Sequence, residues 1–184
     1  MLFRSETGAA QYLRDAKILT IYEGTTAIQA NDLVGRKTAR DGGAVAQAIA
    51  AQIEATEGEL AARGSAACRT MARRLGAGRK AFLDAVAFVT GHSKASPNAV
   101  FAGSVPYLIL AGTVVAGWQM ARALIVAEDR LEQGQEHGQD IEFMQAKIAT
   151  ARFYGDHILV KATALRDSIV EGAEAVTAMS LESF

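Results

Sequence analysis

The pattern of apolar and polar positions along this chain predicts α-helices almost throughout. From residue 44 onward, apolar side chains recur three and four residues apart, which is the spacing of one face of a helix. Gly-Ser, GHSKASPN and GQEHGQ interrupt this pattern with compositions typical of loops. The helical stretches that remain cover residues 44–63, 65–90, 99–133 and 140–179. Long helices joined by short loops predict an all-α fold, an antiparallel four-helix bundle.

The same spacing predicts which side chains the bundle buries. Pro106 is expected to kink the third stretch, because proline removes a helical hydrogen bond and clashes with the preceding turn. Gly76 and Gly78 weaken the middle of the second stretch, and Asp140 is placed to cap the fourth. The core residues expected in the first, second and fourth stretches are Val45, Ile49, Ile53, Leu60, Met71, Leu75, Phe82, Val86, Val89, Phe143, Ile148, Phe153, Ile158, Leu165 and Ile169.

The start of the chain has its own helical pattern. A short helical piece over residues 6–19 is broken at Tyr22-Glu23-Gly24. Thr25 or Thr26 then offers a hydroxyl that caps a second helix. The apolar face expected for this second helix carries Ala27, Ile28, Leu33 and Val34.

Asp41-Gly42-Gly43 is the clearest boundary in the chain. It predicts two units, residues 1–41 and residues 44–184. The opening MLFRSETGAAQYLRDAK is too polar for a signal peptide, and it is more typical of the middle of a domain than of a beginning.

Composition narrows the classes of function. The 184 residues have a formal net charge of -1, so the chain lacks the basic balance typical of nucleic-acid-binding proteins. Two prolines and 7% aromatic residues argue against an all-β chain. The single cysteine, Cys68, excludes an internal disulfide and suits a reducing compartment, so we expect a cytoplasmic protein. Cys68 itself is expected to be a small buried apolar residue.

Residues 95–121 carry no charged side chain, and this run is longer than the roughly 20 residues that cross a bilayer. The run is nevertheless rich in small residues and contains Asn98, Pro106 and Gln119. These features favour a helix buried in a bundle or at a subunit interface over a membrane span.

Most of the residues that carry chemistry are isolated in the sequence. His92, His137 and His157 have no second ligand at metal-binding spacing, so no metal site is expected. The chain has no P-loop and no GxGxxG motif. A basic cluster in the second stretch is interpreted as a solvated face, and its members are Arg73, Arg74, Arg79 and Lys80.

Glu23 is the most informative polar residue, although its position alone leaves two interpretations open. A glutamate just before a helix N-terminus, beside Gly24, is able to point into a cleft near backbone N–H groups. The alternative is a charge that only favours the helix end, worth about 0.3–1 kcal/mol, and because a single carboxylate without a partner is a weak signal of catalysis, the residues alone favour this interpretation. The hydroxyls of Thr25 and Thr26 would likewise suit either a cofactor contact or a plain cap.

At these residues the sequence resembles the acyl-CoA dehydrogenase family. TGAAQYLRDAKILTIYEGTTAIQANDLVGRK, from Thr7 to Lys37, is similar to the last part of the family's flavin-binding helical domain, which carries R-D-A-[KR]-I and YEGT-x-x-I-Q. A looser similarity over Ala44 to Phe184, carried by PYLILAGTVVAGWQMARAL and KIATARFYGDHIL, is to the extra C-terminal helical domain of one long subgroup. The resemblance implies that nearly the whole chain is the C-terminal part of such an enzyme.

The implied reaction is the α,β-desaturation of an acyl-CoA thioester with FAD as cofactor. In the family the glutamate of YEGT is the catalytic base, and Glu23 occupies that position. Gly24 matches a substrate-binding position. Thr25, Thr26 and Ala27 match positions that bind FAD. The resemblance also implies an electron-transferring flavoprotein as electron acceptor and a homo-oligomeric assembly.

The chain departs from the family in its length. The family's N-terminal helical domain, its central β-domain and the earlier helices of the flavin-binding domain have no counterpart here. Met1-Leu2-Phe3-Arg4 stands where a Gly-Gly-x-Gly segment is expected, and Val160 stands where the subgroup often has proline. Because most flavin contacts and much of the acyl-CoA tunnel belong to the missing parts, we expect the chain to be inactive alone. The alternative is a non-catalytic helical-bundle module for oligomerisation or interaction.

Overall fold

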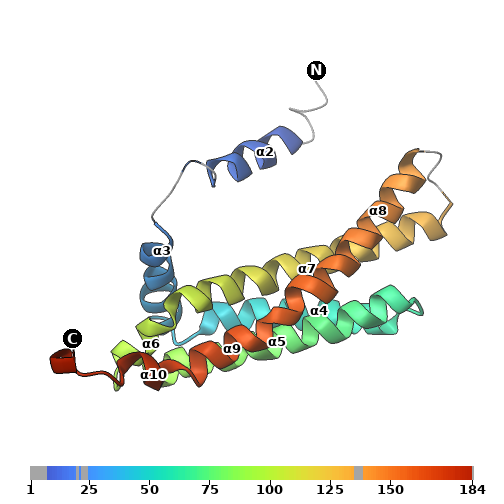
Figure 1. The fold of residues 1–184 in the computed structure, drawn as a ribbon. Coiled ribbons are helices and arrows are strands. Elements are labelled where there is room, and N and C mark those ends of the chain that lie inside the picture. Colours follow the sequence, from blue (N-terminus) through green and yellow to red (C-terminus); the bar gives the residue numbers. More distant parts are fainter. Residues whose placement is uncertain (1–7, 20, 22–24, 135–138, 184) are drawn as a thin grey trace.

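The computed structural model describes residues 8–19, 21, 25–134 and 139–183. Within these residues the secondary structure is helical and contains no strand, so the all-α prediction is confirmed (Figure 1). The elements are α2 (Ala9–Ile18), α3 (Thr26–Asp32), the π-helical η1 (Leu33–Ala39), α4 (Ala44–Ala62), α5 (Ala66–His92), α6 (Pro97–Ala102), α7 (Ser104–Glu132), α8 (Gln139–Phe153), the π-helical η2 (Tyr154–Ile158), the 3-10 helix η3 (Leu159–Lys161), α9 (Ala162–Val170), α10 (Ala173–Thr177) and η4 (Leu181–Ser183).

The long helices form the predicted bundle. α4, α5 and α7 run alongside one another, and the chain returns along them through α8 and α9 (Figure 1). α5 is the central helix, since it packs against α4, α7, α8 and α9. The core predicted for α5 is confirmed in full, because Met71, Leu75, Phe82, Val86 and Val89 are all buried.

The predicted face of α4 is rotated by about one position. Ile53 and Leu60 are buried as expected, but Val45 is exposed. The buried line instead joins Ala46, Ala50 and Ile53, which follow the helical spacing of three to four residues. Two small alanines contribute little to a hydrophobicity pattern, so the larger Val45 dominated the prediction.

The last helix is interrupted where the sequence predicted a continuous one. The chain changes from α8 to π-helical η2 and then to the 3-10 helix η3 before α9 begins. Phe143 and Phe153, both predicted core residues, are exposed, and the buried positions include Ala151, Leu159 and Ile169. Apolar residues five apart cannot share one face of an α-helix, which explains the error. Asp140 lies in the first turn of α8 and not before it, so the predicted cap is also wrong.

The predicted kink at Pro106 is absent, because the helix breaks earlier. α6 ends at Ala102 and α7 begins at Ser104, with Gly103 between them. Pro106 then falls in the first turn of α7, where its missing N–H would have had no helical partner. Gly103 also lies at a point of close packing, since a methyl group added to it would lie 3.2 Å from Cγ2 of Ile169.

Gly78 also has a different role from the one predicted. α5 continues through it without interruption, and its missing side chain makes room for Leu159. A Cβ on Gly78 would lie 3.0 Å from Cδ1 of Leu159, and a Cβ on Gly117 of α7 would lie 3.0 Å from both methyl carbons of Leu159. Leu159 is therefore seated between two helices at positions where neither has a side chain.

The basic cluster on α5 is not one solvated face. Arg79 is only 12% exposed at its side chain, and its guanidinium contacts the Glu57 carboxylate through two hydrogen bonds of 2.7 and 3.1 Å. Arg74 donates to Asp156 of η2 over 3.1 Å. These arginines join α5 to its neighbours, whereas Arg73 and Lys80 are exposed.

α7 meets the length and composition expected of a membrane span. Among the described residues it is the one such helix, with a mean hydropathy of 1.5 over its most apolar 18-residue window, of which 33% is buried. Tyr107, Leu110, Val114 and Leu124 form its buried side. The interpretation as a helix that uses its apolar surface within a bundle or an interface agrees with this packed side, and the opposite side remains uncovered.

α2 stands apart from the bundle (Figure 1). Its large side chains are open to solvent, with Tyr12 78% and Leu13 72% exposed. Leu19 and Ile21, which follow the helix, are exposed as well. An isolated helix of this length is marginally stable in water, so its exposed apolar side chains are typical of a helix that packs against another protein surface.

Cys68 is buried as predicted, and its thiol is hydrogen-bonded. Its Sγ atom donates to Oε2 of Glu128 over 3.1 Å, and its backbone N–H donates to the capping Ser65 hydroxyl over 3.0 Å. Burial raises the pKa of the Cys68 thiol to about 11, and the neighbouring Glu128 carboxylate acts in the same direction.

This pKa gives a prediction for stability at high pH. The folded protein keeps the Cys68 proton, whereas the unfolded chain begins to lose it near the ordinary thiol pKa of 9.0. The thiol's contribution to the free energy of unfolding is therefore complete below pH 9 and is lost as the pH rises toward 11. We expect the difference in free energy of unfolding between the natural protein and Cys68→Ala to shrink across this window. The raised pKa values of Tyr107 and Tyr154 affect both proteins alike, so a constant difference from urea titrations would contradict the assignment.

The packing of Leu159 against Gly78 and Gly117 gives a second prediction. Gly117→Ala should lower the free energy of unfolding by about 1–2 kcal/mol, because the new methyl group overpacks a fully buried leucine. Gly112→Ala on the same helix is the matched control, since a Cβ there meets nothing within 4 Å. The control should be stabilised by about 0.5–1 kcal/mol through helix propensity alone. Equal effects of the two substitutions in chemical denaturation would show that the glycines are not required for packing.

Candidate functional site

The predicted site residues that the structure describes lie at the start of the N-terminal arm, the name used here for residues 25–39, which comprise Thr25, α3 and η1. Glu23 and Gly24 fall outside the described residues, so their predicted roles remain predictions. Thr25 immediately precedes α3, and Thr26 and Ala27 are its first residues. Thr25 is half-buried, whereas Thr26 and Ala27 are exposed.

The predicted hydroxyl cap of α3 is not formed. Thr25 occupies the cap position, but its side chain makes no capping hydrogen bond. Its backbone has φ −96° and ψ −4°, whereas a capping side chain is usually aimed from the extended region. The Thr25 hydroxyl therefore accepts no capping hydrogen bond from the first backbone N–H groups of α3.

α3 passes into η1 without a break. Asp32 and Leu33 at the junction both have right-handed helical backbone angles. The buried positions are Ala30, Val34 and Thr38, four residues apart, whereas Ile28 of the predicted face is 67% exposed. The prediction was wrong for Ala27 and Ile28, because burial follows the contact with α7 and not the size of the side chain.

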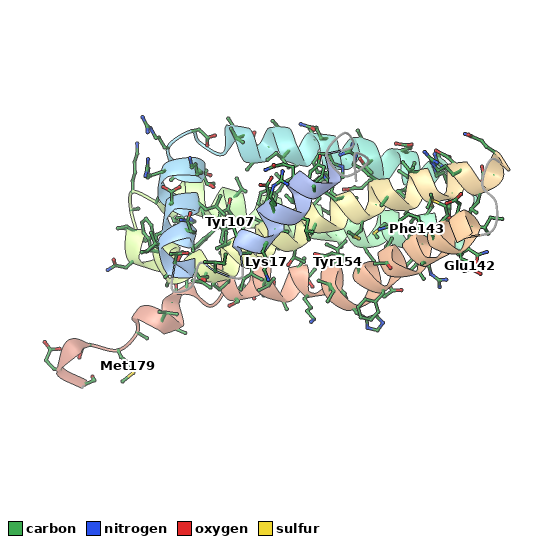
Figure 2. All side chains as sticks on the ribbon, turned by 90° about the horizontal axis from the view of Figure 1, so that it is seen from above. Lys17, Tyr107, Glu142, Phe143, Tyr154 and Met179 are labelled. Atoms are coloured by element: carbon green, nitrogen blue, oxygen red, sulfur yellow. The ribbon has the colours of Figure 1, made fainter. Side chains whose placement is uncertain are left out.

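A hydrogen bond between two buried hydroxyls fixes the C-terminal end of this arm. The Oγ1 atom of Thr38 and the Oη atom of Tyr107 lie 3.0 Å apart, and the residues are 3% and 1% exposed. The Tyr107 ring stacks on Phe82 of α5, with ring centroids 6.1 Å apart. Figure 2 shows Tyr107 at the end of the bundle where α3 stands. Burial raises the pKa of Tyr107, so its hydroxyl stays protonated and retains a hydrogen to share.

The turn after η1 is also held firmly. The Asp41 carboxylate accepts hydrogen bonds from the N–H groups of Gly43 and Val45, at 2.9 and 3.1 Å. Gly43 has φ 80°, and a Cβ there would lie 2.7 Å from Cγ1 of Val86. The predicted turn at Asp41-Gly42-Gly43 is thus present, although the division into two domains at this point stays a prediction.

An apolar groove of about 310 Å³ opens beside the Thr38–Tyr107 pair. Lys37 is the charged residue in its lining, and the hydroxyls of Thr38 and Tyr107 are its other polar groups. Such a volume lies at the lower limit of small-ligand pockets. The lining residues come from η1, α4, α5 and α7, and they are Leu33, Lys37, Thr38, Val45, Ala46, Ile49, Phe82, Tyr107, Ala111, Gly112 and Val115.

The histidines that the structure describes are engaged locally. His92 stacks on Phe88, and its Nδ1 atom lies 3.0 Å from the Phe88 carbonyl oxygen. His157 stacks on Phe153 in the same way. Across residues 8–19, 21, 25–134 and 139–183, no three His, Cys, Asp or Glu residues are grouped as metal ligands.

Sequence reasoning missed the Thr38–Tyr107 pair. The two residues are separated by 69 positions, so no local motif connects them. Two weak signals were available, a tyrosine within an otherwise aliphatic run and a threonine four residues after Val34. Neither signal identifies its partner without the fold.

Comparison with known proteins gives a consistent result for this chain. The family described as "Acetyl-CoA dehydrogenase C-terminal like" matches residues 45–180. The chain is 46% identical over 181 residues to 3-methylmercaptopropionyl-CoA dehydrogenase of Ruegeria pomeroyi, which covers 98% of this chain and 30% of that protein.

Two further relatives extend the comparison. The broad-specificity linear acyl-CoA dehydrogenase FadE5 of Mycobacterium tuberculosis is 33% identical over 165 residues, covering 86% of this chain and 26% of that protein. Butyryl-CoA dehydrogenase of Syntrophomonas wolfei is 31% identical over 153 residues, covering 83% of this chain and 24% of that protein. The chain therefore spans less than a third of the length of each of these relatives.

Proposed function

Because the chain belongs to the acyl-CoA dehydrogenase family, as a C-terminal region of it, we propose that it contributes the catalytic base to a flavin-dependent acyl-CoA dehydrogenase. The reaction is the α,β-desaturation of an acyl-CoA thioester. The observation that carries the proposal is the 46% identity over 181 of the 184 residues, an alignment long enough to include Glu23.

Glu23 is the proposed base. Its carboxylate takes the α-proton of the thioester, and the electrons of that C–H bond form the new α,β double bond as a hydride leaves the β-carbon. FAD, when bound, would accept that hydride. An α-C–H beside a thioester is a weak acid, so the developing enolate oxygen needs hydrogen-bond donors, and the Glu23 backbone N–H is one candidate. Gly24 lacks a Cβ and would let the acyl chain approach closely.

The start of α3 fits a contact with FAD. Thr25, Thr26 and Ala27 offer hydroxyl and backbone N–H donors at an accessible helix end, and the Thr25 hydroxyl is not used as a cap. Polar donors at such an end suit the heteroatoms of a flavin. These residues make up only one edge of a binding site, so the remainder must come from protein segments outside this chain.

The exposed α2 helix supports the same proposal. Its uncovered side chains, which include Tyr12 and Leu13, need a partner surface. The parts of the relatives that this chain does not span would supply that surface, together with the walls that exclude water from Glu23. A dry site raises the pKa of a carboxyl toward the working pH, which a proton-abstracting base requires.

The acyl chain of the substrate is not specified by this region. The relatives are named for different acyl-CoA thioesters, and the chain is similar to all of them. We propose acyl-CoA as the substrate class and an electron-transferring flavoprotein as the electron acceptor.

A chimaera tests the proposed function. Residues 1–184 would replace the corresponding region of the Ruegeria pomeroyi relative, to which they are 46% identical. We expect the purified chimaera to retain FAD and to oxidise an acyl-CoA. Glu23→Gln should lower kcat by about 10²–10⁴-fold with FAD content unchanged, because only the proton acceptor is removed.

Glu142→Gln is the matched control for this experiment. Glu142 is an exposed carboxylate on α8, and its loss should leave kcat unchanged (Figure 2). A Glu23→Gln chimaera as active as the control would remove Glu23 from the mechanism.

A second candidate function is a bundle that joins copies of this chain. The groove beside α7 and the exposed Ile109 and Val115 on that helix favour it, since they form an apolar surface on a helix only partly covered. This function is compatible with the first, because the family resemblance also implies a homo-oligomer for the complete enzyme.

Substitution on α7 tests the second function. Val115→Glu should shift the protein to a lower mass in size-exclusion chromatography with light scattering, because it places a charge in the apolar groove. Val176→Glu, at an exposed position on α10, is the control and should not change the mass. A natural protein that is already a monomer would rule out this function for the isolated chain.

A further inference from the structure

We propose that Tyr107 is a positioning residue, which places the start of α3 through its hydrogen bond to Thr38. This inference rests on the proposed function, in which Thr25, Thr26 and Ala27 form an edge of the FAD site. The bundle then has a defined role in the reaction, because the hydroxyl that sets the position of this edge belongs to α7.

The N-terminal arm is one continuous helical body. The helical backbone is continuous from Thr26 to Ala39, so the arm has no hinge between the site edge and the Thr38 contact. Thr38 lies twelve residues after Thr26, and the α-helical part from Thr26 to Asp32 alone is about 10 Å long. A tilt of about 10° below this part would displace Thr26 by about 2 Å. Displacements of about 1 Å are enough to lower the rate of an enzyme strongly.

The Gly43 N–H donates to the Thr38 carbonyl oxygen over 2.9 Å and holds the backbone at the end of η1, whereas the other side-chain contacts of η1 with the bundle are apolar. Val34 is buried among apolar side chains, and the Phe101 ring lies against Gly35, where a Cβ would be 3.4 Å away. Apolar contacts of this kind tolerate sliding and rotation, whereas a hydrogen bond requires one distance and one direction. The 3.0 Å bond between Thr38 and Tyr107 supplies that requirement inside an otherwise apolar region.

The Tyr107 side chain is itself closely packed within the bundle. Tyr107 is 1% exposed, stacks on Phe82 and lies in the first turn of the long helix α7. Its ring therefore has a fixed direction set by two helices of the bundle. The π-helical form of η1 agrees with a functional role, because π-turns are frequent at functional sites.

Hydrogen–deuterium exchange of the 184-residue chain tests the positioning role directly. Tyr107→Phe and Thr38→Val each remove the bond from one side and leave a buried group unpaired. Each should raise the exchange rate of the amides in residues 27–39 by about tenfold. Thr38→Ser keeps the hydroxyl and should restore slow exchange. Peptides from residues 44–62 should exchange as in the natural protein.

Thr56→Val is the matched control. Thr56 is a buried threonine whose hydroxyl accepts a hydrogen bond of 2.8 Å from Trp118 Nε1, away from the arm. This variant loses a hydrogen bond of the same kind and should leave exchange in residues 27–39 unchanged. Unchanged exchange in Tyr107→Phe, or an equal rise across the whole bundle, would overturn the proposal.

A kinetic measurement in the chimaera distinguishes a failure of the proposed function from a failure of the positioning role of Tyr107. Tyr107→Phe should lower kcat by about 10–100-fold with KM within twofold, because a misplaced flavin edge affects the reacting geometry more than substrate binding. Thr56→Val should keep the parent kcat. A chimaera that holds no flavin would contradict the proposed function, whereas a Tyr107→Phe chimaera with full kcat would contradict the positioning role alone.

Discussion

The hydrogen bond between the buried hydroxyls of Thr38 and Tyr107 joins the two parts of this chain. Thr38 lies in the last turn of the N-terminal arm, and Tyr107 lies in the first turn of α7, the longest helix among the described residues. A buried polar pair is stable only when both members are satisfied, so each hydroxyl specifies the position of the other. The arm carries the residues that resemble an acyl-CoA dehydrogenase site, and the bundle carries the packing that holds the arm. The account of function depends on this connection between them.

The sequence predicted helices well where large side chains lie on the buried face, as in α5 from Met71 to Val89. It failed where small residues pack closely. Ala46 and Ala50 bury the face of α4 in place of Val45, and Gly78 and Gly117 receive Leu159. A glycine or alanine in a helix gives no hydrophobic signal, and its role depends on a neighbour far away in the sequence. The exposed Phe143 and Phe153 show the converse error, because side-chain size suggested burial that the π-turn and the helical period do not allow.

The candidate site could be predicted from the sequence only in part. Spacing and charge left Glu23 as either a helix-end charge or a catalytic group, and the resemblance of the YEGT segment decided in favour of the base. No rule of local sequence predicts that Tyr107 contacts the arm 69 residues earlier, since that contact exists only after the bundle has folded. The chain spans less than a third of the length of these relatives, and our proposal assigns the remaining walls of the site to segments outside it.

The most direct test of this account is whether the chain completes a flavin site that, on our proposal, neither polypeptide forms alone. The purified chain would be mixed anaerobically with FAD and a saturated acyl-CoA, with and without the remainder of the Ruegeria pomeroyi relative supplied as a separate polypeptide. The visible absorbance of the flavin would then be followed. We expect no bleaching with either polypeptide alone and substrate-dependent bleaching when both are present. Bleaching by the remainder alone, or no bleaching in the mixture, would contradict the account.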